Sequence, residues 1–148
     1  MMIKKKIAII GLGYVGLPLA AAFSKKYTIL AYDNDSARVR ELNSGLDRIE
    51  QLSKTDLIQL QQRLTFSEDP KSLSDYNTYI ITVPTPVTPA KEPDLSFLLE
   101  ASKTVGQYLK KGDMVIYEST VYPGCAEEDC VPVLEKASGL KFNTDFFC

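Results

Sequence analysis

The chain has 148 residues, of which 45% are hydrophobic and 24% charged, and its formal net charge at pH 7 is -2. These values fit one globular domain, and the 17 Lys and Arg residues are spread along the sequence, which argues against a nucleic-acid partner. Histidine is absent, so a Ser-His-Asp or histidine-metal mechanism is excluded within the chain. The three cysteines contain no CxxC pair, so they indicate neither a disulfide framework nor a zinc site and fit a reducing cytoplasm.

The N-terminal segment combines three lysines at 4–6 with an uncharged stretch over 7–23, a pattern that also occurs in secretory signal peptides. Gly11, Gly13 and Gly16 interrupt this stretch at the spacing of a nucleotide-binding turn. The stretch is also shorter than the ~20 residues that a membrane-spanning helix needs. We therefore interpret it as a strand, a tight turn and a helix, and expect no membrane association.

Strand and helix patterns alternate along the rest of the chain. The apolar runs predict strands over 6–10, 28–32, 64–67, 78–83 and 113–118, and the helical patterns cover 14–25, 35–43, 54–62, 94–109 and a last segment ending at 138. Asp35 and Asp94 are the expected N-caps, and Gly45 and Gly139 the expected stops. Four prolines over 84–93 predict a stiff loop. The alternation predicts an α/β domain over 1–148 with a doubly wound, mostly parallel sheet, which binds ligands at the carboxyl ends of its strands.

The first strand is followed by a glycine motif, Gly11-Leu12-Gly13-Tyr14-Val15-Gly16, which matches GxGxxG and opens a predicted helix. The helix N-terminus supplies N–H groups and partial positive charge for a pyrophosphate. Asp33 follows about 20 residues later at the end of the second strand, where a carboxylate accepts hydrogen bonds from the adenosine ribose. The combination predicts NAD as cofactor. Asp33 and nearby Asp35 disfavour the 2'-phosphate of NADP, although Arg38 partly compensates.

Two further loops leave the carboxyl ends of predicted strands. In one interpretation, the loop at 82–86 places its backbone and the Thr85 hydroxyl against the cofactor. In the other, it is only a rigid surface loop. The loop at 118–124 brings Ser119 and Thr120 near the nicotinamide ring, or else these residues only cap the next helix.

These motifs together resemble those of the UDP-glucose/GDP-mannose dehydrogenases, and within them the UDP-N-acetylhexosamine dehydrogenases of bacterial capsule and Vi-type polysaccharide synthesis. The resemblance covers the whole chain and rests on segments 9–18, 83–86, 93–95 and 118–124 together with Asp33 and Arg38. It implies that Gly13 and Val15 contact the pyrophosphate, that Asp33 and Arg38 contact the adenosine ribose, and that Thr120 also helps to hold a catalytic water. The cofactor-binding residues predicted in this way are Gly11, Gly13, Tyr14, Val15, Gly16, Asp33, Arg38, Val83, Pro84, Thr85, Ser119 and Thr120.

The resemblance also implies the reaction. Members of the family oxidise the 6-hydroxymethyl group of a UDP-sugar to the uronic acid with two NAD+, through an aldehyde and a cysteine thioester. The catalytic cysteine and lysine would lie in later domains, so we expect this chain to be a fragment that binds NAD without turnover, from a cytoplasmic and homo-oligomeric protein. Cys148 would then be a core residue in a strand and not the nucleophile. Cys125 and Cys130 are interpreted as small buried residues.

Two alternatives stay open. The first alternative is an NAD(H)-sensing module. The second is another NAD-dependent dehydrogenase, of the β-hydroxyacid or 3-hydroxyacyl-CoA type. These dehydrogenases share the glycine turn and the acid after the second strand, and the loops with Thr85 and Thr120 favour the sugar dehydrogenase.

Overall fold

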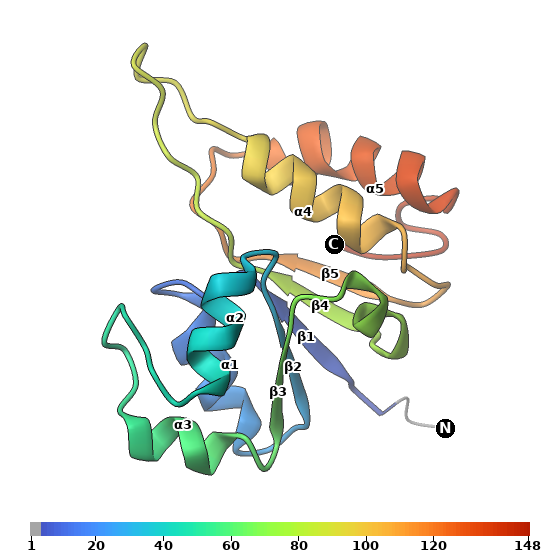
Figure 1. Ribbon diagram of the computed structural model, residues 1–148. Helices are drawn as coiled ribbons and strands as arrows, with labels where there is room; N and C mark the ends of the chain where they lie inside the picture. Colours follow the sequence, from blue (N-terminus) through green and yellow to red (C-terminus); the bar gives the residue numbers. More distant parts are fainter. Residues whose placement is uncertain (1–3) are drawn as a thin grey trace.

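The computed structural model describes residues 4–148 as one parallel sheet covered by helices on both faces (Figure 1). Neighbouring strands are parallel throughout, in the order β3-β2-β1-β4-β5. This confirms the predicted doubly wound α/β fold. The strands are β1 (Ile7–Ile10), β2 (Ile29–Tyr32), β3 (Leu64–Ser67), β4 (Thr78–Ile81) and β5 (Met114–Tyr117).

The helices form two layers. Figure 1 shows α4 and α5 on one face of the sheet, and α1, α2 and α3 on the other. A 3-10 segment and a π-helical segment, neither of them predicted, lie before β4 and directly before α5. The bounds are α1 (Gly16–Ser24), α2 (Ser36–Asn43), α3 (Lys54–Leu60), the 3-10 segment (Pro70–Asp75), α4 (Ser96–Gly106), the π-helical segment (Ala126–Cys130) and α5 (Val131–Ser138).

Burial of β1 explains why its sequence is apolar at every position. Consecutive side chains of a strand point to opposite faces. Ile7 and Ile9 therefore pack in the core beneath α1, α2 and α3, whereas Ala8 and Ile10 pack in the core beneath α4 and α5. With a strand on each side and a helical layer on each face, β1 lies at the centre of the sheet, and the turn that follows it opens at the carboxyl edge of the sheet.

Helix ends match most of the predicted capping residues. The Asp35 carboxylate accepts N–H bonds from Ala37 and Arg38 and so begins α2. The prediction of Asp94 as N-cap was wrong by one residue, because the N-cap of α4 is Leu95, although the Asp94 carboxylate accepts the Ser96 N–H. Gly139 ends α5 in the left-handed conformation, with φ of 71°. The prediction was wrong for the end of α4, which stops at Gly106 because the next turn tightens into i−3 hydrogen bonding.

The proline-rich loop between β4 and α4 projects away from the body of the domain (Figure 1). It contains no helix, as predicted, and an antiparallel bridge between Val87 and Pro93 closes its base. The Thr88 N–H donates to the Glu92 carbonyl at 2.8 Å, and Lys91 near the tip has a φ of 61°.

The cysteine predictions have mixed outcomes. Cys125 and Cys130 are fully buried, as expected for small core residues. The prediction that Cys148 lies in the core was wrong, since its side chain is exposed. Two residues earlier Phe146 is fully buried, and the Phe147 backbone pairs with β5. Within residues 4–148, no helix is long and apolar enough to cross a membrane.

Candidate functional site

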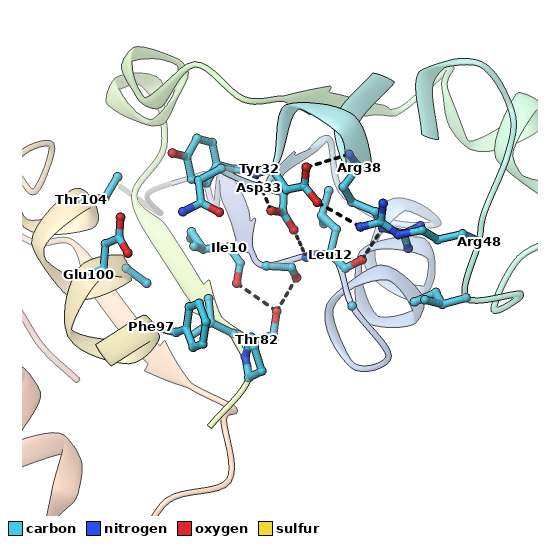
Figure 2. A pocket seen from close by; sticks show the side chains of 18 residues that line it. Ile10, Leu12, Tyr32, Asp33, Arg38, Arg48, Thr82, Phe97, Glu100 and Thr104 are labelled. Atoms are coloured by element: carbon cyan, nitrogen blue, oxygen red, sulfur yellow. Dashed lines mark hydrogen bonds and ion pairs between the residues drawn. The ribbon is translucent and has the colours of Figure 1, made fainter. Parts of the chain in front are cut away.

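A pocket with a volume of about 330 Å³ opens at the carboxyl ends of β1, β2 and β4 (Figure 2). Its walls come from the glycine turn, the end of β2, the loop after α2, the end of β4 and one side of α4. The lining residues are Ile10, Gly11, Leu12, Gly13, Tyr32, Asp33, Asn34, Asp35, Arg38, Arg48, Ile49, Thr82, Val83, Pro84, Phe97, Glu100, Ala101 and Thr104.

The three glycines of the turn have different structural roles. Gly11 has a φ of +97°, and a Cβ on Gly16 would lie 1.7 Å from the Gly11 carbonyl oxygen, so these positions accept no side chain. A Cβ on Gly13 would meet no atom within 4 Å. The second glycine is therefore not required by packing, which leaves it to keep the surface open for a ligand.

The start of α1 presents unpaired backbone donors. In the structure of residues 4–148, the N–H groups of Gly13, Tyr14 and Val15 donate no hydrogen bond to the protein. No side chain caps α1, and its first turn contains no acidic residue. The positive end of the helix dipole is thus uncompensated, which suits a phosphate group. The side chains of Tyr14 and Val15 are exposed and lie outside the pocket lining, as does Gly16.

Asp33 is held in place by the backbone. Its Oδ2 accepts the Leu12 N–H and its Oδ1 accepts the Asp35 N–H, both at 2.9 Å. These bonds fix the half-buried carboxylate at the rim of the pocket. Each carboxylate oxygen has a second lone pair, so ribose hydroxyls have acceptors there.

Arg38 also lines the pocket, but its guanidinium is directed at protein groups. Nε donates to the Leu12 carbonyl at 2.9 Å (Figure 2). Nη1 donates to Glu41 Oε1 at 2.9 Å. Nη2 lies 2.9 Å from Asp47 Oδ1 in an ion pair without hydrogen-bond alignment. The side chain is only 4% exposed, so it supports the glycine turn from behind.

The charges around Asp33 and Arg38 are predominantly negative. Arg48 pairs with Asp35 at 3.0 Å and with Glu41 at 3.5 Å, and its side chain holds the pKa of Asp35 below the usual range. Together with Asp33 and Asp47, four carboxylates surround the guanidinium groups of Arg38 and Arg48. A 2'-phosphate would add negative charge to this group, which favours NAD over NADP.

The two other predicted loops contact each other. The Thr85 hydroxyl donates to the Thr120 carbonyl at 2.6 Å, and the Ser119 hydroxyl donates to the Val83 carbonyl at 2.7 Å. Val83 and Pro84 line the pocket, whereas Thr85, Ser119 and Thr120 lie beyond its lining. The structure therefore brings the two loops side by side at the carboxyl edge of the sheet.

Sequence reasoning missed two walls of the pocket. Phe97, Glu100 and Thr104 recur at helical spacing on one side of α4, so their shared face was available as a signal. Arg48 and Ile49 come from an irregular loop without a periodic pattern, and no sequence signal points to them.

Residues 5–147 match the UDP-glucose/GDP-mannose dehydrogenase family, NAD binding domain. The chain belongs to this family. It is 52% identical over 142 residues to the UDP-N-acetyl-D-glucosamine 6-dehydrogenase of Pseudomonas aeruginosa and 49% identical over 142 residues to that of Salmonella typhi. Each alignment covers 96% of this chain and 33% of the relative, so the chain spans about a third of their length.

A solved structure supports the same assignment. The UDP-D-ManNAc dehydrogenase of Pyrococcus horikoshii superimposes with a TM-score of 0.87 at 36% identity, over 95% of this chain and 34% of that one. The predicted family and the predicted NAD-binding domain are confirmed by these comparisons.

Proposed function

We propose that this chain is the cofactor-binding part of a dehydrogenase that oxidises the 6-hydroxymethyl group of a UDP-N-acetylhexosamine to the uronic acid, for surface polysaccharide synthesis. The identities of 52% and 49% with two UDP-N-acetyl-D-glucosamine 6-dehydrogenases support this substrate class and favour the glucosamine sugar. The proposal includes a cytoplasmic, homo-oligomeric full-length enzyme that works with NAD+.

The cofactor half of the proposal is carried by the free N–H groups at the start of α1, next to the open surface at Gly13. Gly13, Tyr14 and Val15 would hold the pyrophosphate through these groups, and Asp33 would accept the ribose hydroxyls. Arg38 would act behind the ribose by holding Leu12. When bound, NAD+ supplies the acceptor for the hydride that leaves the sugar.

The nicotinamide half would extend along the loops after β4 and β5. Val83, Pro84 and Thr85 would contact it from one loop, and Ser119 and Thr120 from the other. Thr120 uses its carbonyl to bind Thr85, and its hydroxyl has no protein partner among residues 4–148. This free hydroxyl supports the proposed role of Thr120 in holding a catalytic water.

Calorimetric titration with NAD+ and NADP+ tests the cofactor site. We expect the chain to prefer NAD+, and Asp33→Ala to weaken NAD+ binding roughly tenfold or more, a loss of about 1.4 kcal/mol or more. Asp94→Ala is the matched control, because this carboxylate also accepts a backbone N–H, that of Ser96, but lies outside the pocket lining. Equal affinity for both dinucleotides, or unchanged binding by Asp33→Ala, would contradict the proposal.

Turnover by the full-length enzyme tests the substrate. UDP-N-acetyl-D-glucosamine should reduce NAD+ to NADH, followed as absorbance at 340 nm, with two NADH formed per sugar. A full-length protein that binds NAD+ but forms no NADH with any UDP-sugar would favour an NAD(H)-sensing module.

A further inference from the structure

Asp47 stands out among the carboxylates outside the pocket lining. Its side chain is fully buried, although it lies in the irregular loop between α2 and α3. Oδ2 accepts the N–H groups of Gln51 at 2.7 Å and Leu52 at 3.0 Å, Oδ1 accepts that of Ile49 at 3.2 Å, and Oδ1 also pairs with Arg38. A buried charge with this many partners is fixed in one position.

The contacts of Asp47 shape one wall of the pocket. The chain turns around its carboxylate at 48–52, and Glu50 adopts a φ of 55°, which costs free energy for a residue other than glycine. This turn places Arg48 and Ile49 in the pocket lining.

A second set of contacts leads from Asp47 to the glycine turn. Asp47 pairs with Arg38, and Arg38 Nε holds the Leu12 carbonyl, while the Leu12 N–H is held by Asp33. In a trans peptide the C=O and N–H groups point in opposite directions. Holding the Leu12 carbonyl therefore also fixes the direction of the Gly13 N–H, one of the free donors at the start of α1.

We propose that Asp47 is a positioning residue of the dinucleotide site. It orients the Gly13 N–H and the pocket wall formed by Arg48 and Ile49. It also pairs with Arg38, so that this guanidinium is not available to bind the 2'-phosphate of NADP. The inference rests on the proposed cofactor site. It extends that site to a residue outside the pocket lining, and it assigns the rejection of NADP to the carboxylate that neutralises Arg38.

The test is calorimetric titration of the chain and its variants with NAD+ and with NADP+. Asp47→Asn keeps the shape of the side chain and removes its charge, so we expect roughly tenfold weaker NAD+ binding and a smaller preference for NAD+ over NADP+. The change in preference separates this role from a loss of stability, which would weaken both dinucleotides alike. Asp56→Asn is the matched control, because Asp56 closes the capping box of α3 and does not line the pocket.

A double-mutant cycle tests whether Asp47 acts through Arg38. The change Arg38→Met removes the buried cation. The double variant, Arg38→Met with Asp47→Asn, removes both charges of the pair, so that no unpaired charge is left buried. We expect Asp47→Asn to weaken NAD+ binding less in the Arg38→Met background than in the unchanged chain, because only the contacts of Asp47 with the N–H groups of its own loop then remain to be disturbed. The double variant also provides a folded comparison should Asp47→Asn alone not fold.

Three results would overturn the inference: wild-type NAD+ affinity and preference in Asp47→Asn, equal losses in Asp47→Asn and Asp56→Asn, or fully additive effects in the cycle. Absence of NAD+ binding by the unchanged chain is a different result, since it would refute the proposed cofactor site itself.

Discussion

The hydroxyl of Thr82 donates a hydrogen bond to the carbonyl oxygen of Gly11, 2.7 Å away, and so ties the end of β4 to the turn that follows β1. The same hydroxyl lies 3.0 Å from the Ile10 carbonyl, and Thr82 is buried. A Cβ on Gly16 would lie 2.4 Å from it. The glycine turn is thus supported from beneath by a neighbouring strand, not by its own sequence alone.

Replacing Thr82 with valine should lower the free energy of unfolding by roughly 1–3 kcal/mol, because the buried Gly11 carbonyl oxygen loses its hydroxyl donor while the side-chain volume hardly changes; the Ile10 carbonyl keeps the Thr82 N–H as its donor. Urea unfolding followed by circular dichroism measures this. Thr65→Val is the control, since Thr65 is exposed on the edge strand β3 and should change little. Equal stability of the two variants would show that the Thr82 hydroxyl does not support the turn.

Replacing Gly16 or Gly13 with alanine should distinguish a glycine that the folded structure needs from one that NAD+ binding needs. Gly16→Ala places a methyl group 1.7 Å from the Gly11 carbonyl oxygen, so the variant should lose both thermal stability and NAD+ binding. Gly13→Ala meets no protein atom within 4 Å, so it should keep its melting temperature and lose affinity for NAD+. Thermal denaturation and calorimetry on both variants test this pair. Normal NAD+ binding by Gly13→Ala would place the pyrophosphate elsewhere.

Acid should remove the stability contributed by Asp47. Burial alone would raise the pKa of this carboxyl, but the Leu52 and Gln51 N–H groups and Arg38 outweigh burial and lower the pKa below its ordinary value of 3.8. A lowered pKa in the folded state means that the contribution is complete above pH 3.8 and is lost as the pH falls through the lowered value.

The pH dependence can be isolated by comparing the chain with Asp47→Asn in urea unfolding over a pH series. The difference in free energy of unfolding should be largest near neutral pH and should shrink below pH 3.8, where the carboxylate is protonated in the unfolded chain but still ionised in the folded one. A difference that stays constant across the series would mean that the Asp47 charge does not contribute.

The two buried cysteines should resist thiol reagents in the folded chain. Burial raises the pKa of all three thiols, to about 11 for Cys130 and about 12 for Cys148, so accessibility decides the order of reaction, and the side chains of Cys125 and Cys130 are inaccessible. N-ethylmaleimide at neutral pH should therefore modify the exposed Cys148 first, with Cys125 and Cys130 reacting only after denaturation. Mass spectrometry of the labelled peptides reads out the order, and early labelling of Cys125 would contradict the packing around α5.

The fold was predictable because its strands are buried on both faces. The apolar runs over 6–10, 28–32 and 64–67 match β1, β2 and β3 to within one residue. Helix ends were less predictable, since they depend on tertiary contacts as well as on capping residues. The predicted start of α1 at 14 falls two residues early, because Val15 still belongs to the turn that exposes the free N–H groups.

The candidate site was predictable where a sequence motif determines the backbone conformation. It was not predictable where the orientation of a side chain depends on partners from distant parts of the sequence. The glycine spacing and Asp33 identify one side of the pocket. The orientation of Arg38 depends on Asp47, which lies nine residues further along the chain in a loop without periodicity. Nothing in the local pattern of that loop indicates that its carboxylate turns inward.

The projecting loop between β4 and α4 has a practical consequence. Lys91 lies between the bridged residues Val87 and Pro93, exposed and outside every helix and strand, so a protease that cleaves after lysine should open the chain there first. The first piece would carry β1 to β4 and the second α4, β5 and α5. The two pieces would be joined by the hydrogen bonds between β4 and β5 and by the core beneath α4 and α5. Position 91 is accordingly the place to divide this domain into two complementing halves, whose reassociation would rebuild the pocket from both.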